Sequence, residues 1–167
     1  MKKLASLVVL ALPLVSWGAS NSPDAHFYRA VAQSGIAEVE AGKLAQQKAV
    51  DPALAKFGAM MVKDHSAAND QLKALGQSKD VSLPSSSSVE DMAAKAKLEL
   101  LSGASFDKAY IKNQISAHQD AMKLLQHEIS SGQDSDAQAF ARKILPTVRS
   151  HLAAIQQLAA AAAAPQP

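Results

Sequence analysis

The stretch MMVKDHSAAND, residues 60–70, lies inside a longer run whose apolar residues recur every three or four positions. This spacing places them all on one face of an α-helix. The position in the middle of that face is occupied by His65, and Asp64 comes directly before it. We therefore expect a buried helix face that carries an imidazole. Asp64, rotated about 100° from His65, either orients a neighbouring side chain or lies at the solvent edge. The apolar residues of the run are Leu54, Phe57, Met61, Ala68, Leu72 and Leu75.

The remainder of the chain is also helical in composition. It contains 34 alanines and few β-branched or aromatic residues, and no useful length of alternating strand pattern is present. A serine-rich connection, DVSLPSSSS at residues 80–88, is long enough to cross a bundle from end to end. The sequence predicts an all-α, ferritin-like four-helix bundle of two hairpins, with a short extra helix in the crossover. An up-down-up-down bundle is the alternative. The expected helices span about residues 24–50, 52–79, 89–101 (stopped by Gly103), 106–131 and 134 into the alanine tract.

The two later long segments repeat the pattern seen around His65. His118 and His151 each interrupt an apolar face near the middle of a predicted helix, and Glu38 takes the equivalent position in the first segment. At about 1.5 Å per residue, Glu38 and His65 lie roughly 16–20 Å from the first hairpin turn. By the same rise, His118 and His151 lie roughly 20–25 Å from the second turn. A bundle would bring all four side chains into one central layer.

Three imidazoles and one carboxylate form a common ligand set for a first-row metal ion, and the layer predicts a site for copper or zinc. Met61 and Met122 each lie four residues from a histidine of the layer, so each shares a helix face with an imidazole. Thioether sulfur suits copper, Cu(I) in particular. The alternative is a metal-free polar layer in which the imidazoles and a carboxylate satisfy one another. The candidate metal ligands are Glu38, His65, His118, His151, Met61 and Met122.

The first twenty residues, MKKLASLVVLALPLVSWGAS, have the pattern of a secretory signal peptide. Two lysines precede an apolar run that is too short to span a membrane, and small residues follow it. We expect cleavage near Asn21, which leaves a soluble periplasmic protein without an integral membrane segment. The predicted organisation is a signal peptide at residues 1–20, a four-helix bundle at 21–158 and an Ala/Pro-rich flexible tail at 159–167.

Charge and cysteine content narrow the classes of function. Loss of Lys2 and Lys3 with the signal peptide would take the 17 basic residues to 15, equal to the 15 acidic ones. A balanced chain has no electrostatic footprint for nucleic acid, so we expect none as a partner. Because the chain has no cysteine, no disulfide strengthens it. Its stability must come from helix packing.

Several segments carry a family resemblance. The run from Phe27 to Leu72, and the later segments FDKAYIKNQISAHQDAMKLLQ and FARKILPTVRSHLAAIQQL, resemble the exported bacterial proteins of the domain-of-unknown-function 4142 family. The resemblance covers residues 27–158, with MVKDHS, AHQDA and LPTVRSHL as its most specific parts. It implies a ferritin-like helical bundle in the periplasm or envelope. It implies no chemistry.

The chain departs from the di-iron pattern of ferritin-like proteins. That pattern requires a glutamate three residues before the histidine on two helices. Val62, Ile115 and Val148 stand at those positions, so no di-iron centre is expected. The leading hypothesis is a non-enzymatic helical bundle that binds copper or zinc. The alternatives are an envelope stress or interaction protein with a structural histidine layer, and a mononuclear metal enzyme that acts on small oxidants.

Overall fold

The computed structural model describes residues 22–164, and all regular structure in this part of the chain is helical. The predicted all-α class is therefore confirmed. The predicted signal peptide lies outside the described residues. The last helix extends through the first residues of the predicted flexible tail. The helices are α1 (Pro23–Lys48), α2 (Pro52–Ser78), α3 (Val89–Glu99), α4 (Gly103–Ser131) and α5 (Ser135–Ala163).

Local sequence explains where these helices begin. The side chains of four capping residues each accept a hydrogen bond from a backbone N–H of the first turn, which would otherwise lack a partner. α4 has no such cap and begins at Gly103, whose φ of 59° is in the left-handed region that glycine tolerates. The expectation that Gly103 ends the preceding helix was wrong, because α3 ends earlier at Glu99. The capping residues are Ser22, Asp51, Ser88 and Asp134.

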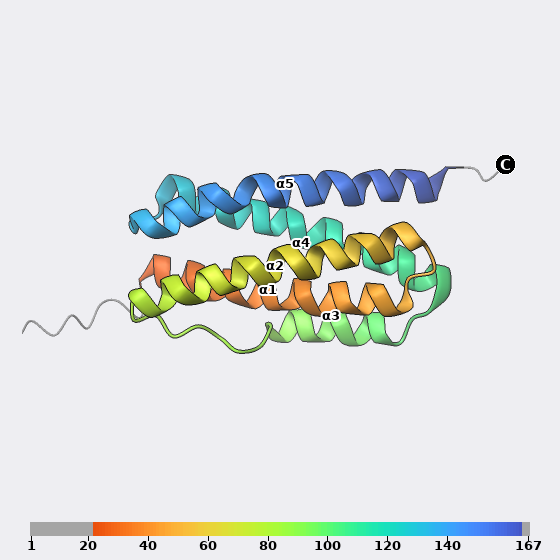
Figure 1. The fold of residues 1–167 in the computed structure, drawn as a ribbon, viewed down its shortest axis with the longest axis horizontal. Coiled ribbons are helices and arrows are strands. Elements are labelled where there is room, and N and C mark those ends of the chain that lie inside the picture. Colours follow the sequence, from red (N-terminus) through yellow and green to blue (C-terminus); the bar gives the residue numbers. More distant parts are fainter. Residues whose placement is uncertain (1–21, 165–167) are drawn as a thin grey trace, which may run out of the picture.

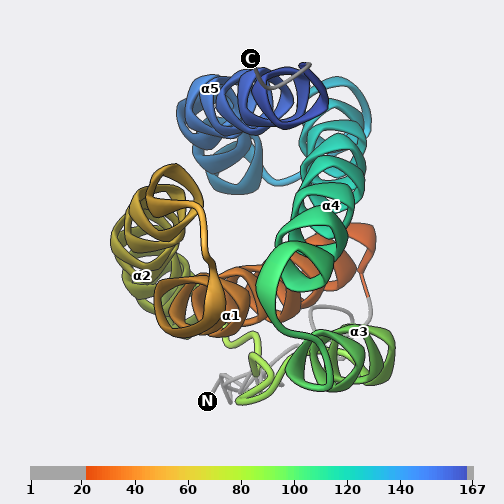
Figure 2. The same cartoon turned by 90° about the vertical axis from the view of Figure 1, so that its right-hand side faces the viewer.

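The four long helices lie side by side around a shared interior. α1 packs against α2 and α4 packs against α5, so the chain forms two helical hairpins. Viewed along the helices, their order around the interior is α1, α2, α5, α4 (Figure 2). The short helix α3 lies outside this ring, where it packs against α1 and α4.

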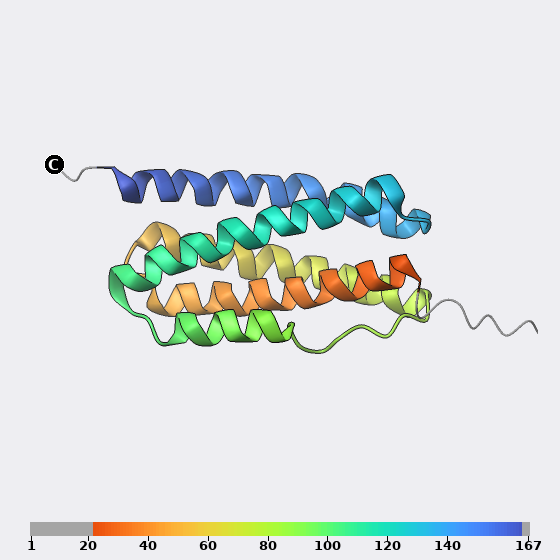
Figure 3. The same cartoon turned by 180° about the vertical axis from the view of Figure 1, so that it is seen from behind.

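Chain direction follows from the long connection between the hairpins. α1 and α5 run in one direction, and α2 and α4 run in the opposite direction (Figure 1). The segment from residue 79 to 102, which includes α3, returns the chain along the length of the molecule before α4 begins (Figure 3). The connection therefore makes α2 and α4 parallel.

A close contact joins the helices of the first hairpin. A β-carbon built on Gly42 would lie 2.6 Å from the backbone oxygen of Gly58, and one built on Gly58 would lie equally close to the oxygen of Gly42. Glycine at both positions lets the backbones of α1 and α2 approach without a clash. This contact holds the second turn of α2 close against α1.

The buried apolar residues form two clusters, one toward each end of the molecule. One cluster contains Phe27, Tyr28, Leu72, Leu125 and Phe140. The other contains Leu54, Phe57, Met61, Phe106 and Ile155. Along every long helix, the predicted polar position falls between the residues that belong to the two clusters. The core is therefore divided by a polar layer at mid-height.

Within residues 22–164, no helix is long and apolar enough to cross a membrane.

Candidate metal centre

Three histidines from three different helices meet in the polar layer. His65 is on α2, His118 on α4 and His151 on α5. One ring nitrogen of each lies within 4.8 Å of the corresponding nitrogens of the other two. The ring centroids are 5.5 Å to 5.8 Å apart. The structure thus brings together the three imidazoles that the sequence singled out.

His118 is held in one tautomer by its own helix. Its Nδ1 lies 2.9 Å from the backbone oxygen of Gln114, one turn earlier on α4. A carbonyl oxygen can only accept, so Nδ1 carries the proton and donates it. The other nitrogen, Nε2, is then unprotonated. It is buried and has no hydrogen-bond partner.

His151 is held in a similar way by a side chain of another helix. Its Nε2 lies 3.0 Å from a carboxylate oxygen of Asp64, on α2. Because a carboxylate accepts, Nε2 donates the proton and Nδ1 carries the free lone pair. Nδ1 is buried without a partner. Of the two expectations for Asp64, an orienting group or a residue at the solvent edge, the hydrogen bond favours the first, and the histidine that Asp64 orients lies on a different helix.

His65 completes the set with a third buried nitrogen. Its Nε2 is also without a hydrogen-bond partner. Phe57, one of the apolar residues on the same helix, lies beside the other two imidazoles, with ring centroids 6.4 Å from those of His118 and His151. The aromatic ring closes the layer on the side of the second apolar cluster.

Burial keeps all three imidazoles neutral at physiological pH. Burial, together with a smaller effect of the neighbouring His118 and His151, lowers the pKa of His65 to about 3. Burial likewise lowers the pKa of His118 to about 4, against an opposing effect of its bond to Gln114. The pKa of His151 is lowered by burial, although the Asp64 carboxylate works against this. Neutral imidazole is the form that coordinates metals.

Glu38 contacts the layer at His118, on the side of the ring nitrogen that is bonded to Gln114. Its carboxylate oxygen Oε1 is 3.8 Å from His118 Nδ1, the nitrogen that is already bonded to Gln114. It therefore does not belong to the set of three converging nitrogens. Burial raises the pKa of Glu38 to about 7, and the Gln114 side chain opposes that rise. We interpret Glu38 as a group that contacts a ligand residue.

The two candidate methionines lie in the apolar clusters. Met61 is fully buried in the cluster with Leu54 and Phe57, and its β-carbon would lie 3.1 Å from a β-carbon built on Gly42 of α1. Met122 packs against the other cluster. Both therefore have a packing role in this structure, and the histidines carry the metal hypothesis.

Gln114 and Tyr110 are buried beside the layer, and neither periodicity nor a motif in the sequence marks them as functional residues. Gln114 supplies the carbonyl that orients His118, and its position was not distinguished from other residues of α4. Tyr110 is fully buried, and its pKa is raised by burial and by the nearby Glu38. Its hydroxyl has no hydrogen-bond partner in the described structure. A tyrosine on an apolar helix face resembles an ordinary core residue.

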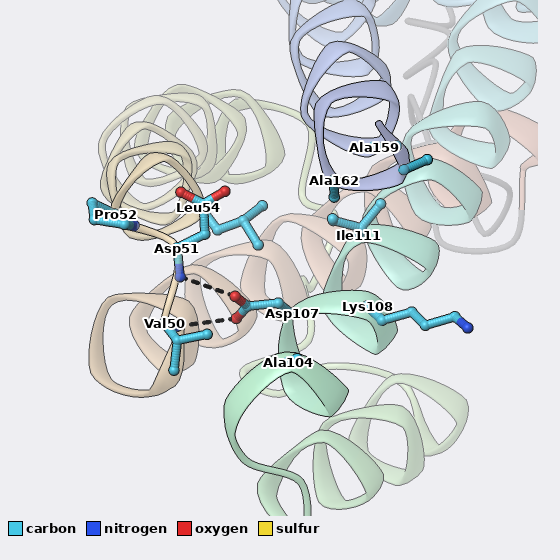
Figure 4. Close-up of a pocket in the computed structure, with 11 residues that line it drawn as sticks. Val50, Asp51, Pro52, Leu54, Ala104, Asp107, Lys108, Ile111, Ala159 and Ala162 are labelled. Carbon is cyan, nitrogen blue, oxygen red and sulfur yellow. Dashed lines mark hydrogen bonds between the residues drawn. The ribbon is translucent and has the colours of Figure 1, made fainter. Parts of the chain in front are cut away.

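Two cavities differ in their relation to the histidines. A cleft of about 250 Å³ between α2 and α5 is lined in part by His65 and His151. A larger cavity of about 900 Å³ lies at the end of the molecule where the α1–α2 turn approaches α4 and α5 (Figure 4). Its buried carboxylate, Asp107, is already occupied by the backbone N–H groups of Val50 and Asp51. The larger cavity therefore offers no free carboxylate at Asp107. The smaller cleft is the better candidate binding site, because two of the three histidines line it.

Comparison with known proteins identifies the family. A family model described as a domain of unknown function, DUF4142, matches residues 13–158. The chain belongs to the DUF4142 family. The match includes α1 to α4 and all three histidines of the layer. Neither the curated proteins nor the solved structures contain a match to the chain. Function must therefore be argued from the site itself.

Proposed function

We propose that this DUF4142 protein is an exported helical-bundle protein that binds one copper or zinc ion through His65, His118 and His151. The proposal is carried by one observation: each of these imidazoles has a buried ring nitrogen without a hydrogen-bond partner, and the three side chains offer nitrogens within 4.8 Å of one another. An unsatisfied buried polar group costs about 1–3 kcal/mol. Three together are an expensive arrangement unless a ligand occupies their lone pairs.

The other ring nitrogen of His118 and of His151, which donates a hydrogen bond, supports the same interpretation. Histidine ligands commonly donate their other ring N–H to a carbonyl or a carboxylate, which fixes the tautomer and aims the coordinating nitrogen. His118 donates to a backbone carbonyl and His151 donates to Asp64. These bonds leave His118 Nε2 and His151 Nδ1 unprotonated, with lone pairs that could coordinate a metal ion.

The ligand set favours copper or zinc over iron. Imidazole suits copper and zinc, whereas mononuclear non-haem iron sites add a carboxylate to two histidines. A metal bound at about 2.0–2.1 Å from each nitrogen needs those nitrogens about 3.4 Å apart. In this structure the candidate nitrogens lie within 4.8 Å of one another, so the three imidazoles would have to draw closer together around a bound ion. A three-histidine set also leaves one coordination position for water or another ligand.

The proposed architecture is a ferritin-like four-helix bundle. The parallel arrangement of α2 and α4, with α3 in the connection between the hairpins, supports this topology. The absence of the glutamates required for a di-iron pair gives the proposed site a different chemistry from that of the iron-storage members of the fold. Export is proposed from the signal-peptide pattern at residues 1–20.

Metal content tests the proposed function. We expect elemental analysis of the untagged protein, purified from the periplasm, to show copper or zinc near one equivalent per chain. His118→Leu should remove it. His127→Leu should retain it, because His127 is an exposed histidine of the same helix. Metal-free wild-type protein that takes up neither ion on titration would leave the histidines as a structural polar layer and contradict the proposal.

A further inference from the structure

A surface cleft leads to two of the three proposed ligands. It runs between α2 and α5 and is lined in part by Asp64, His65 and Gln71 from α2, and by Lys143, Thr147 and His151 from α5. Its volume of about 250 Å³ is enough for a partly hydrated metal ion. His118 does not line the cleft and lies deeper, with 1 % of its surface exposed. A metal that arrives through this cleft meets His65 and His151 before His118.

Two smaller spaces near the layer are less suited to a cation. One of about 30 Å³ also touches His65, but most of its lining is apolar, including Val31, Leu124 and Phe140. The other, of similar size, lies between α1, α3 and α4; it has a polar lining that includes Glu38, but none of the three histidines lines it. A hydrated cation loses its water less readily against apolar walls than beside polar ligands. The α2–α5 cleft is thus the favoured route among these three.

Asp64 connects the mouth of the cleft to the proposed metal ligands. Its side chain is 32 % exposed, so its carboxylate is accessible to solvent. The same carboxylate accepts the proton of His151 Nε2 at 3.0 Å, and the His151 side chain is only 3 % exposed. The Asp64 side chain is therefore in contact both with bulk water and with the buried His151. A negative charge at such a position attracts cations and raises their rate of association.

We propose that the metal ion enters and leaves through the α2–α5 cleft, with Asp64 as both the capturing carboxylate at its mouth and the positioning residue for His151. This inference rests on the proposed metal site. Asp64 first attracts the hydrated cation. It then keeps the His151 N–H engaged, so that Nδ1 remains free to coordinate. The ion is thus handled by a route that permits exchange, as a buffer or carrier of metal requires.

Two substitutions at Asp64 separate its charge from its hydrogen bond. Asp64→Asn removes the charge but keeps an oxygen that accepts from His151. We expect it to slow Zn²⁺ uptake several-fold, with an affinity loss below about tenfold. Asp64→Ala removes both properties, and we expect an affinity loss of about 10–100-fold, as for other partners of metal-bound histidine. A purely structural Asp64 would change the melting temperature of metal-free protein and leave these constants unchanged.

A second pair of substitutions tests the route independently of charge. Thr147 is an exposed residue that lines the cleft, and Thr147→Trp should obstruct it. We expect slower uptake and slower release by similar factors, so that the equilibrium affinity changes little. The matched control is Ser116→Trp, at an exposed position on α4 outside the cleft lining. It should leave both rates unchanged.

The measurement is stopped-flow transfer of Zn²⁺ between the untagged protein and a chromogenic chelator, at low and high salt. The expected result is slow exchange in Thr147→Trp, wild-type exchange in Ser116→Trp and a reduced salt effect on uptake in Asp64→Asn. Wild-type protein that binds Zn²⁺ while all the variants exchange at the wild-type rate would overturn the route and leave the metal site standing. If wild-type protein binds neither Zn²⁺ nor copper in equilibrium titration, the metal site itself is overturned.

Discussion

The central histidine layer and the buried aspartates at the two ends of the molecule solve the same physical problem in opposite ways. Both place polar groups in a helical core, where each needs a partner. At the ends, the carboxylates of Asp24 and Asp107 accept hydrogen bonds from backbone N–H groups. In the layer, His65, His118 and His151 each keep one buried nitrogen without a partner. The aspartates are polar groups that build the fold, whereas under the proposed metal site the free histidine nitrogens are the groups that take a ligand.

The end aspartates join the two hairpins reciprocally. Asp24, in the first turn of α1, accepts from Gln133 N–H at 2.7 Å and Asp134 N–H at 3.0 Å, at the α4–α5 turn. Asp107, near the start of α4, accepts from Val50 N–H at 3.2 Å and Asp51 N–H at 2.9 Å, at the α1–α2 turn (Figure 4). An aspartate of each hairpin therefore accepts hydrogen bonds from backbone N–H groups at the turn of the other hairpin.

Removal of either end aspartate should produce the largest loss of stability. Asp24→Ala or Asp107→Ala leaves two backbone N–H groups without their acceptor, and we expect a loss of about 2–4 kcal/mol in the free energy of unfolding. The Asn variants keep one accepting oxygen and should lose less. Urea denaturation followed by circular dichroism measures both.

The same denaturation experiment in the presence of metal shows whether the end aspartates and the histidine layer act independently. The aspartate variants should retain the metal-induced stabilisation of wild type, because neither residue contacts the histidine layer. Aspartate variants as stable as wild type, or unable to bind metal, would remove the distinction between structural and ligand-binding polar groups.

Lowering the pH should destabilise the metal-free protein through the histidine layer. We expect this loss of stability to be somewhat smaller than that caused by removing an end aspartate. Burial holds the pKa of His118 at about 4, below its usual 6.5. The unfolded chain takes up a proton near pH 6.5 and the folded protein does not, so stability present above pH 6.5 is lost as the pH falls toward 4. Between pH 7 and pH 5 this contributes a loss of about 2 kcal/mol for His118. His118→Leu should abolish that part of the pH dependence in metal-free protein.

A buried carboxyl group acts in the opposite direction. Burial raises the pKa of Glu38 to about 7, so its contribution to stability is present below about pH 4.5 and is lost as the pH rises through 7. The wild-type curve alone therefore mixes opposing effects. The informative quantity is the difference between wild type and His118→Leu, measured by denaturation in chelator at pH 7 and pH 5. Parallel curves would show that His118 is not held neutral by burial.

Much of the fold followed from periodicity, because each long helix has one clear apolar face. The polar positions on those faces pointed to the three histidines that the structure brings together, since an imidazole interrupts three of the apolar stripes. Helix ends were predicted within a few residues, apart from Gly103. Proline supplied the signal for the starts of α1 and α2.

Contacts between helices could not be predicted in the same way. The bond from Asp64 to His151 joins residues 87 positions apart, and nothing in either local pattern indicates it. Glu38 was expected to be a ligand because its height along the helix is right. Its rotation around α1 and the side of the His118 ring that it faces depend on packing that periodicity does not contain. The same limit applies to Asp24 and Asp107.

Thermal melting of the untagged protein with copper, zinc or chelator at pH 7 shows whether His65, His118 and His151 bind a metal ion. A ligand that binds only the folded state stabilises it by about 2.7 kcal/mol at a free concentration 100 times its dissociation constant. We predict a rise in the wild-type melting temperature that chelator reverses, its loss in His65→Leu, His118→Leu and His151→Leu, and its retention in His127→Leu. A wild-type curve unchanged by both metals would contradict the claim that the unpartnered nitrogens form a metal site.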